Sequence, residues 1–156
     1  MNRYDLMNAD VIEEFRANAG VVGGGLHGYE VILLHHIGAL SGIERVIPLV
    51  RFRQEDGQTV IVASGKAGRS GHPQWYRNVL ARPRVTVESG TKTYLADATE
   101  VPEPARSTLW NKIKAESPLY AEYDRRTGDG RTIPLLLTKP IRWGQPLRVS
   151  QRRYPN

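Results

Sequence analysis

The chain contains no cysteine, and this absence excludes disulfides, iron–sulfur clusters, thiolate zinc sites and a cysteine nucleophile. It also fits a reducing compartment. No apolar run approaches the roughly 20 residues that a membrane span needs. The carboxylates and histidines form no cluster with the spacing of metal ligands, so we expect no metal site. The charged residues that follow Met1 are unlike a signal peptide. We therefore expect a cytoplasmic protein, with association to a membrane surface as the alternative.

What the chain has in excess is positive charge. Its 156 residues carry a formal net charge of +6 and are enough for one domain with a substantial core. A basic protein favours an acidic partner, which is a nucleic acid, an anionic membrane surface or a polyanionic small molecule. No DNA- or RNA-binding motif is present, so we expect no nucleic-acid partner. Part of the charge lies in an expected C-terminal tail, residues 141–156, with Arg142, Arg148, Arg152 and Arg153.

Short apolar runs separated by turn residues predict a mainly β domain that covers residues 1–156. Short turns such as Asp56–Gly57 and Ser89–Gly90 connect neighbouring runs, so the sheet should be mainly antiparallel. About six strands with helices at their ends indicate a closed or nearly closed barrel rather than a doubly wound sheet. The expected strands are Val31–His36, Arg45–Phe52, Thr59–Ala63, Val85–Glu88, Lys92–Ala96 and Ile133–Thr138.

Helical patterns lie before and between these strands. In residues 10–19, Val11, Ile12 and Phe15 share one face, which predicts a short amphipathic helix. Asn8 or Asp10 can cap this helix and Gly20 can end it. The helix and the glycine-rich bend that follows it make up residues 1–28. Further helices are expected over residues 73–81 and 104–115, followed by a tyrosine-bearing segment over residues 118–126.

The most informative segment is the loop that follows the expected strand at residues 59–63. It runs from Ser64 to His72, contains three glycines and one lysine, and leads into a helix that begins near Pro73. Glycine and serine residues give a loop with accessible backbone N–H groups, and the start of a helix leaves further N–H groups unpaired. A strand, a glycine-rich loop and a helix N-terminus together suit an anion or a polar cofactor ring.

Several polar and aromatic side chains have both a functional and a structural interpretation. His35 and His36 are adjacent in a strand and point to opposite faces, so we expect one to face a cavity and the other to pack in the core. Trp75 can pack in the core, and Asn78 can brace a neighbouring loop. Tyr120 and Tyr123 lie three residues apart, and they can pack as core or form an aromatic wall over a ligand.

Taken together, these blocks resemble the deazaflavin-dependent nitroreductase family of actinobacteria, whose members use coenzyme F420. The resemblance extends from residue 11 to residue 134. It includes the Glu14-to-Asn18 run, the Gly38-to-Arg45 turn with Val46 and Pro48, and the Ala63-to-Gly68 loop. It also includes the His72–Pro73–x–Trp75–Tyr76–x–Asn78 helix start, the Tyr120–x–x–Tyr123 pair and the Arg131–Thr132–Ile133–Pro134 segment. Each block is short, but their order and spacing together are specific.

The resemblance implies a split β-barrel, related to flavin-reductase barrels that bind FMN, with peripheral helices. It implies that Ser41 and Arg45 meet the cofactor phosphate, and that Lys66, Ala67 and Gly68 meet the edge of the deazaflavin ring through backbone groups. Pro48, Ser64, Gly65, Pro73, Trp75 and Asn78 would complete the cofactor site. Tyr120 and Tyr123 would lie over the substrate and act in catalysis.

Two positions depart from the pattern of the family. The family turn usually reads Gly-x-Lys-Ser-Gly, and Leu40 stands here in place of its lysine. The family loop usually has serine before its lysine, and here Gly65 stands at that position. Loss of one charge-assisted contact with the phosphate costs roughly 1.5–3 kcal/mol of binding free energy.

The sequence therefore predicts an oxidoreductase that passes a hydride from reduced F420, an 8-hydroxy-5-deazaflavin, to a small electron-poor acceptor. Nitroaromatics, quinones and enones are the expected acceptors. The strongly anionic cofactor suits the basic chain, and hydride transfer requires little of the protein beyond orientation and electrostatics. The alternatives are an oxidoreductase that uses FMN or FAD on the same barrel and a non-catalytic carrier of a cofactor or lipid. A homodimer and a peripheral membrane contact with a quinone acceptor are further expectations.

Overall fold

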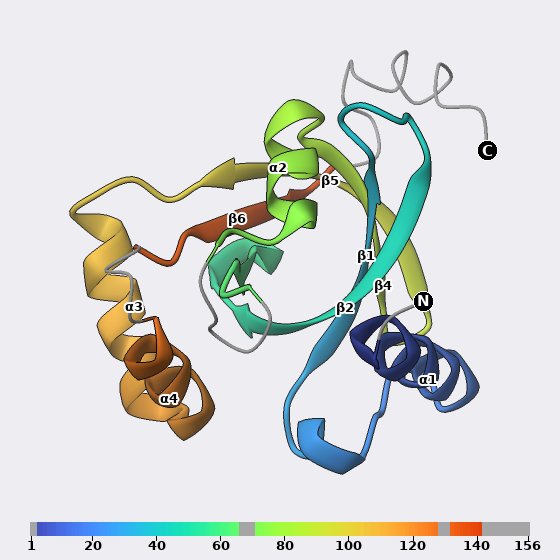
Figure 1. Ribbon diagram of the computed structural model, residues 1–156, viewed down its shortest axis with the longest axis horizontal. Helices are drawn as coiled ribbons and strands as arrows, with labels where there is room; N and C mark the ends of the chain where they lie inside the picture. The colour runs from blue at the N-terminus through green and yellow to red at the C-terminus, as the bar shows by residue number, and fades with distance from the viewer. Residues whose placement is uncertain (1–2, 66–70, 128–131, 142–156) are drawn as a thin grey trace.

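A computed structural model of the chain describes residues 3–65, 71–127 and 132–141. Within these ranges the chain forms six β-strands, which are joined edge to edge into a closed antiparallel barrel (Figure 1). The strands are β1 (Val31–Ile37), β2 (Glu44–Arg53), β3 (Thr59–Val62), β4 (Arg84–Ser89), β5 (Lys92–Glu100) and β6 (Leu135–Pro140). Their order around the barrel is β1-β2-β3-β6-β5-β4. The predicted antiparallel barrel is therefore confirmed.

The described helices lie outside the barrel wall or across its rim. These helices are α1 (Arg3–Ala17), α2 (Gln74–Ala81), α3 (Ala105–Glu116) and α4 (Pro118–Arg126). Figure 1 shows α1 beside β1, the α3–α4 pair at the opposite side of the barrel, and α2 close to the β1–β2 hairpin. Two short 3₁₀ turns, Gly24–Leu26 and Glu55–Gly57, complete the described elements. None of the helices within the described ranges is long and apolar enough to cross a bilayer.

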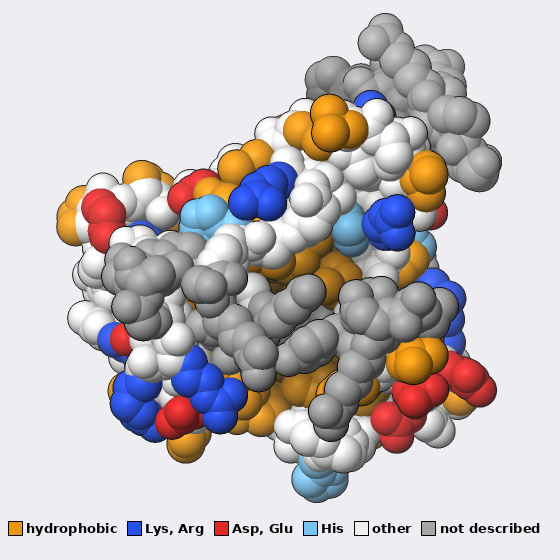
Figure 2. Space-filling model, in the orientation of Figure 1, with side chains coloured by type: hydrophobic (Ala, Val, Ile, Leu, Met, Phe, Trp, Pro, Cys, Tyr) orange, Lys and Arg blue, Asp and Glu red, His pale blue; other side chains and the backbone are white. Residues whose placement is uncertain are grey.

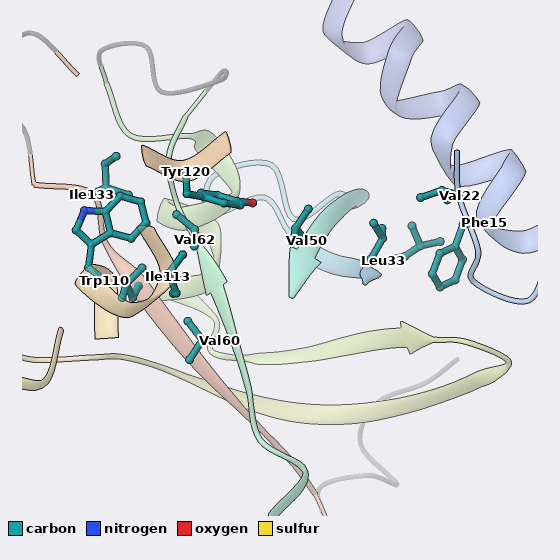
Figure 3. Packing of buried hydrophobic residues seen from close by; sticks show 12 residues of the cluster. Phe15, Val22, Leu33, Val50, Val60, Val62, Trp110, Ile113, Tyr120 and Ile133 are labelled. Atoms are coloured by element: carbon teal, nitrogen blue, oxygen red, sulfur yellow. The ribbon is translucent and has the colours of Figure 1, made fainter. Parts of the chain in front are cut away.

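Alternate side chains of the strands divide the core into two apolar clusters. The inner cluster fills the barrel and includes Ile32, Leu34 and Ile61, together with Trp75 and Val79 of α2. The outer cluster lies between the wall and the other helices, and its members come from both ends of the chain. Figure 3 shows it extending from Trp110, Ile113 and Tyr120 past Val62 and Val50 to Leu33, Phe15 and Val22. The barrel wall is therefore apolar on both faces, and the side chains of β1 are buried along most of its length.

Three elements have ends that differ by two or more residues from the sequence-based predictions. Helix α1 begins at Arg3 rather than near residue 10, and its early residues Leu6 and Met7 are exposed. Strand β5 continues past the predicted end at residue 96 to Glu100, because it pairs with both β4 and β6. Strand β6 begins at Leu135 rather than at residue 133. Pro134 has no N–H to donate to a strand ladder, although its carbonyl accepts from Ala63 N at 3.0 Å.

Helix α1 ends where its chain passes very close to another hairpin. Gly20 has a φ of +93° and its N–H donates to the carbonyl of Phe15 at 2.8 Å. A Cβ atom at Gly20 would lie 2.8 Å from the Cα of Gly90, in the β4–β5 turn. Glycine is therefore required here for both the backbone angle and the close approach. Helix α1 ends at Ala17, earlier than predicted, and Ala19 already has a φ of +53° before the chain reaches Gly20.

Candidate functional site

The β1–β2 hairpin ends in a turn, residues 38–43, that is closed by its own hydrogen bonds. Gly38 N–H donates to the carbonyl of Ile43 at 2.9 Å, and Gly42 N–H donates to the carbonyl of Gly38 at 2.9 Å. The hydroxyl oxygen of Ser41 accepts from Ile43 N–H at 3.1 Å. A Cβ atom at Gly38 would lie 2.2 Å from this hydroxyl oxygen, so glycine leaves the space that Ser41 uses. The turn therefore holds Ser41 in a defined position at the surface.

This turn presents unused hydrogen-bond donors and a positive charge to solvent. Within the described part of the chain, the backbone N–H groups of Leu40 and Ser41 form no hydrogen bond. Arg45 follows the turn at the start of β2, is exposed, and forms no ion pair with any described residue. Successive free backbone N–H groups beside a guanidinium are suited to an anion. The Leu40 side chain is fully exposed, but its backbone N–H remains available for this role.

Asn78 on α2 ties this turn to the rim of the barrel. Its Oδ1 accepts from the backbone N–H of Ala39 at 3.0 Å and from Gln74 Nε2 at 3.1 Å. Asn78 is only 1% exposed, and Trp75 of the same helix is also buried in the inner cluster. The structural interpretation of both residues is confirmed, because Trp75 packs in the core and Asn78 braces a neighbouring loop. Their predicted contacts with a cofactor stay predictions.

The two adjacent histidines of β1 have opposite surroundings. His36 is buried, lies beside Asn78, and has a pKa lowered to about 4 by its burial and by the positive charge of Arg45. His36 is therefore the predicted core histidine. The other histidine was then expected to face a cavity, but His35 does not. It faces an ion cluster, in which its Nε2 lies 2.6 Å from Glu88 and its Nδ1 lies 3.4 Å from Glu44.

This ion cluster could not be predicted, because its members are far apart along the chain. Arg16 of α1 pairs with both carboxylate oxygens of Glu88 in β4, at 3.1 and 2.7 Å. The guanidinium of Arg16 and the ring of His35 together lower the pKa of the Glu88 carboxyl, whose partial burial opposes the shift. The cluster therefore fastens α1 to the outer face of the barrel.

The glycine-rich loop is described only at its two ends. Ser64 and Gly65 follow β3 and are partly buried, and Pro73 immediately precedes α2. Gly65 has a φ of +71°, in the left-handed region that favours glycine, which accounts for glycine rather than the serine expected there. The predicted ring contacts at Lys66, Ala67 and Gly68 lie outside the described residues.

A second contact missed by sequence reasoning lies at the start of α2. The Tyr76 hydroxyl donates to the carboxylate of Glu100, at the end of β5, over 2.6 Å. Burial and this carboxylate raise the pKa of Tyr76 to about 12. The ring of His72 lies against Tyr76 with centroids 5.0 Å apart. The helix start is therefore anchored to β5 as well as to the hairpin turn.

The predicted substrate residues lie on the outer face of the barrel. Tyr120 is buried in the outer cluster, with its ring 5.4 Å from that of Phe52 and 6.2 Å from that of Trp110. Tyr123 is partly buried, and its ring packs on the edge of Tyr120 at 5.3 Å. Burial raises the pKa of Tyr120, so its phenol stays protonated. Tyr120 thus packs as core, and Tyr123 is the more accessible of the two.

The predicted residues therefore fall into two groups around one face of the molecule. One group lies where the hairpin meets α2, and the other lies on the outer side of the barrel. Ser41, Arg45 and Asn78 lie together where the hairpin meets α2, while Pro48 faces the outer side of β2 opposite Leu33. Figure 2 shows hydrophobic side chains in the middle of this face, between the hairpin at the upper right and the α3–α4 side at the left. The face thus combines an end that carries free N–H donors and a guanidinium with an apolar centre, an arrangement that suits a ligand with a charged arm and a flat ring.

Comparison with known proteins gives the family that the sequence matches. A family model described as F420H(2)-dependent quinone reductase matches residues 8–140. An F420H(2)-dependent quinone reductase of Mycobacterium tuberculosis is 29% identical over 127 residues, which are 79% of this chain and 83% of that protein.

Solved structures agree with that match. The structure of an F420-H2 dependent reductase, FDR-A, is 36% identical, with a TM-score of 0.60 over 70% of this chain and 93% of that one. A second solved structure, described as a domain-swapped dimer, is 31% identical. Its TM-score is 0.62, and the match covers 88% of this chain and 100% of the other.

Proposed function

Since this chain belongs to the F420H(2)-dependent quinone reductase family, it is an F420H2-dependent oxidoreductase on a split β-barrel, and we propose that its acceptor is a quinone. Nitroaromatics and activated enones are related electron-poor acceptors that the same site would reduce. The observation that carries the proposal is the hairpin turn with its free donors, next to an apolar centre. A quinone is a small flat molecule that needs apolar contact and few polar partners.

The hairpin turn would hold the phosphate of the cofactor. Arg45 would supply the positive charge, and the free N–H groups of Leu40 and Ser41 would donate hydrogen bonds. This assignment fits an anionic group, because no carboxylate of the described chain neutralises Arg45. The missing lysine at Leu40 removes one charge from the turn but leaves its backbone donors.

The ring of the cofactor would lie from the glycine-rich loop toward the outer face of β2. Ser64, Gly65 and Pro73 lie at the described ends of that loop, and Pro48 offers a partly buried apolar surface. Lys66, Ala67 and Gly68 would meet the ring edge through their backbone groups. Trp75 and Asn78 would support this arrangement from α2, since both side chains are buried.

When bound, the reduced deazaflavin supplies the hydride. Complete reduction of a quinone also needs a proton at the acceptor oxygen. Tyr123 would orient that oxygen through its hydroxyl and donate the proton, because its ring is partly exposed at the surface of α4. Tyr120 would fix the position of the Tyr123 ring through their edge contact. The apolar centre of the face would keep water away from the acceptor.

The experiment that tests this function is a turnover assay with reduced F420 and menadione, with reduced FMN assayed in parallel. Turnover with F420H2 well above the rate without protein supports the proposal, and turnover with FMN alone would overturn the cofactor assignment. Arg45→Ala should weaken F420 binding about tenfold or more, since a charge-assisted contact is lost. Arg82→Ala is the matched control, because Arg82 is also exposed but lies at the C-terminal end of α2 and not in the hairpin.

A gain of affinity gives a second test of the same turn. Leu40→Lys adds a cation beside the free N–H groups and should tighten F420 binding, most strongly at low salt. Unchanged affinity would show that the turn does not reach the phosphate. F420 binding without any turnover, across a broad panel of acceptors, would favour a carrier instead of an enzyme.

We also propose a homodimer and contact with a membrane surface. A 31% identical relative is described as a domain-swapped dimer, which supports the first proposal. Leu40 and Ile43 are exposed apolar side chains on a turn beside Arg45, which suits an anionic lipid surface that carries a quinone. Light scattering tests the dimer. Sedimentation with anionic vesicles tests the contact, which Leu40→Ser with Ile43→Ser should weaken. The expected location is the cytoplasm.

A further inference from the structure

The hydrogen bonds of Asn78 fix the orientation of its side-chain amide. A backbone N–H can only donate, so the atom that faces Ala39 N at 3.0 Å must be the amide oxygen. Gln74 Nε2 donates to the same oxygen at 3.1 Å. The Nδ2 group of Asn78 therefore points the other way, toward the ring of His36.

This orientation determines the protonation state of His36. Nδ2 of Asn78 lies 3.0 Å from Nδ1 of His36, and an amide N–H₂ group can only donate. Nδ1 must therefore be the acceptor, which requires the neutral ring with its proton on Nε2. A proton on Nδ1 would set two donors against each other in a buried site, because both residues are almost fully enclosed.

We propose that His36 is a positioning residue that, as the neutral Nε2–H tautomer, orients Asn78 so that the hairpin turn at residues 38–43 is held against α2. The proposal rests on the proposed function in one respect, because it assigns to that turn the cofactor phosphate. The chain of contacts runs from His36 to Asn78 and then to Ala39. Without His36, the amide of Asn78 loses the acceptor for its Nδ2 group, so we expect it to rotate more freely and to weaken the only described hydrogen bond between the turn and α2.

The groups around His36 favour the neutral ring. Burial favours it most. On β2, Glu44 lies against His35 and opposes the shift only weakly, whereas the positive charge of Arg45, the cross-strand neighbour of His36, disfavours a second cation. From its own strand His35 acts in the same direction, although its side chain lies on the other face. Helix α2 offers two uncharged amides, and β4 adds the apolar Val85 to the same inner cluster. Acid that protonates His36 should therefore release the turn.

The first test uses the protein without cofactor. Nitrogen-15 NMR should show His36 as the Nε2–H tautomer at neutral pH. His36→Leu should speed amide hydrogen exchange at Ala39 about tenfold or more. The reason is that the Asn78 oxygen, which accepts from the Ala39 N–H, is then freer to rotate. In His36→Asn an amide oxygen can replace Nδ1, so slow exchange should return. His35→Leu is the matched control and should leave Ala39 unchanged.

The second test measures F420 affinity and turnover in the same variants. His36→Leu should weaken F420 binding about tenfold while turnover at saturating F420H2 stays close to that of the parent protein. His36→Asn should restore most of the affinity. Between pH 7 and pH 4 the affinity of the parent should fall more than that of His36→Asn, which has no titrating ring. A loss of turnover without loss of affinity would overturn the positioning role.

The outcomes separate this proposal from the proposed function. An Nδ1–H tautomer, or unchanged exchange at Ala39 in His36→Leu, overturns the positioning role whatever the protein binds. Faster exchange with unchanged F420 affinity overturns the assignment of the phosphate to the turn. If the parent protein neither binds nor oxidises F420H2, the proposed function fails. The exchange and tautomer results then still decide whether His36 holds the turn.

Discussion

The two faces of the barrel wall attach their helices by different means. On the inner side, α2 is held by buried apolar side chains and by the uncharged network of His36, Asn78 and Ala39. On the outer side, α1 is held by Phe15 and by an ion cluster in which Arg16 meets Glu88. Salt acts strongly on a partly exposed ion pair and weakly on a buried uncharged network. The site therefore depends on the fastening that is less sensitive to salt.

A matched pair of leucines gives the largest expected difference between the faces. Leu33 and Leu34 are adjacent and both fully buried, but Leu33 belongs to the outer cluster and Leu34 to the inner one. Leu34→Ala should lower the free energy of unfolding by about 4 kcal/mol, because a closed barrel cannot collapse onto the cavity. Leu33→Ala should cost about 2.5 kcal/mol, because nearby α1 can shift to fill the space. Urea unfolding measures both, and equal costs would contradict the comparison.

The pH dependence of stability gives the next largest effect. The pKa of His36 lies at about 4 in the folded state, below its ordinary value of 6.5. Between these pH values the unfolded chain binds the proton more tightly than the folded protein does. The free energy of unfolding is therefore highest above pH 6.5 and falls as the pH is lowered toward 4. We expect a loss of about 2 kcal/mol that His36→Asn largely removes. Urea unfolding at pH 7, 5.5 and 4 measures it, and His35→Asn serves as the control that keeps this loss.

Disturbing the close approach of Gly20 to Gly90 should lower the free energy of unfolding slightly less than acid does. Gly20→Ala should lower the free energy of unfolding by about 1.5 kcal/mol, because alanine is strained at a φ of +93° and its Cβ would meet the Cα of Gly90. Gly24 has a φ of +60° with open space around it. Gly24→Ala therefore reports the strain alone, at about 1 kcal/mol. If both variants lose the same stability, the contact with Gly90 does not matter.

The ion cluster itself should give the smallest effect. Glu88→Gln should cost about 1 kcal/mol at pH 7, since it weakens the contacts with Arg16 and His35. The pKa of Glu88 is lowered in the folded state, so its contribution is present above its ordinary value of 4.5 and disappears as pH falls through the folded value. The parent protein and the variant should therefore converge at acidic pH. A constant difference at pH 7 and pH 3 would argue against the ion pair.

Periodicity and turn residues were enough to predict the barrel strands, because each strand carries its own apolar run. The first turns of α1 were missed since Leu6 and Met7 bury no apolar face that could mark the start. At the site, the turn at Ser41 and the start of α2 at Pro73 could be placed. The link from His36 to Asn78 could not, because 42 positions separate them and only the folded barrel brings them together. The ion pair of Arg16 with Glu88 was missed for the same reason.

The position of β6 in the barrel has a consequence for the order of folding. β6 lies between β3 and β5, although it follows all the other described strands along the chain. During synthesis, β3 and β5 therefore each keep an unpaired edge until residues 135–140 have been made. Open edges can pair with other chains, and late, long-range closure slows folding. This protein therefore completes its barrel only when its last described strand has been made, and its nascent chains depend on that strand to avoid aggregation.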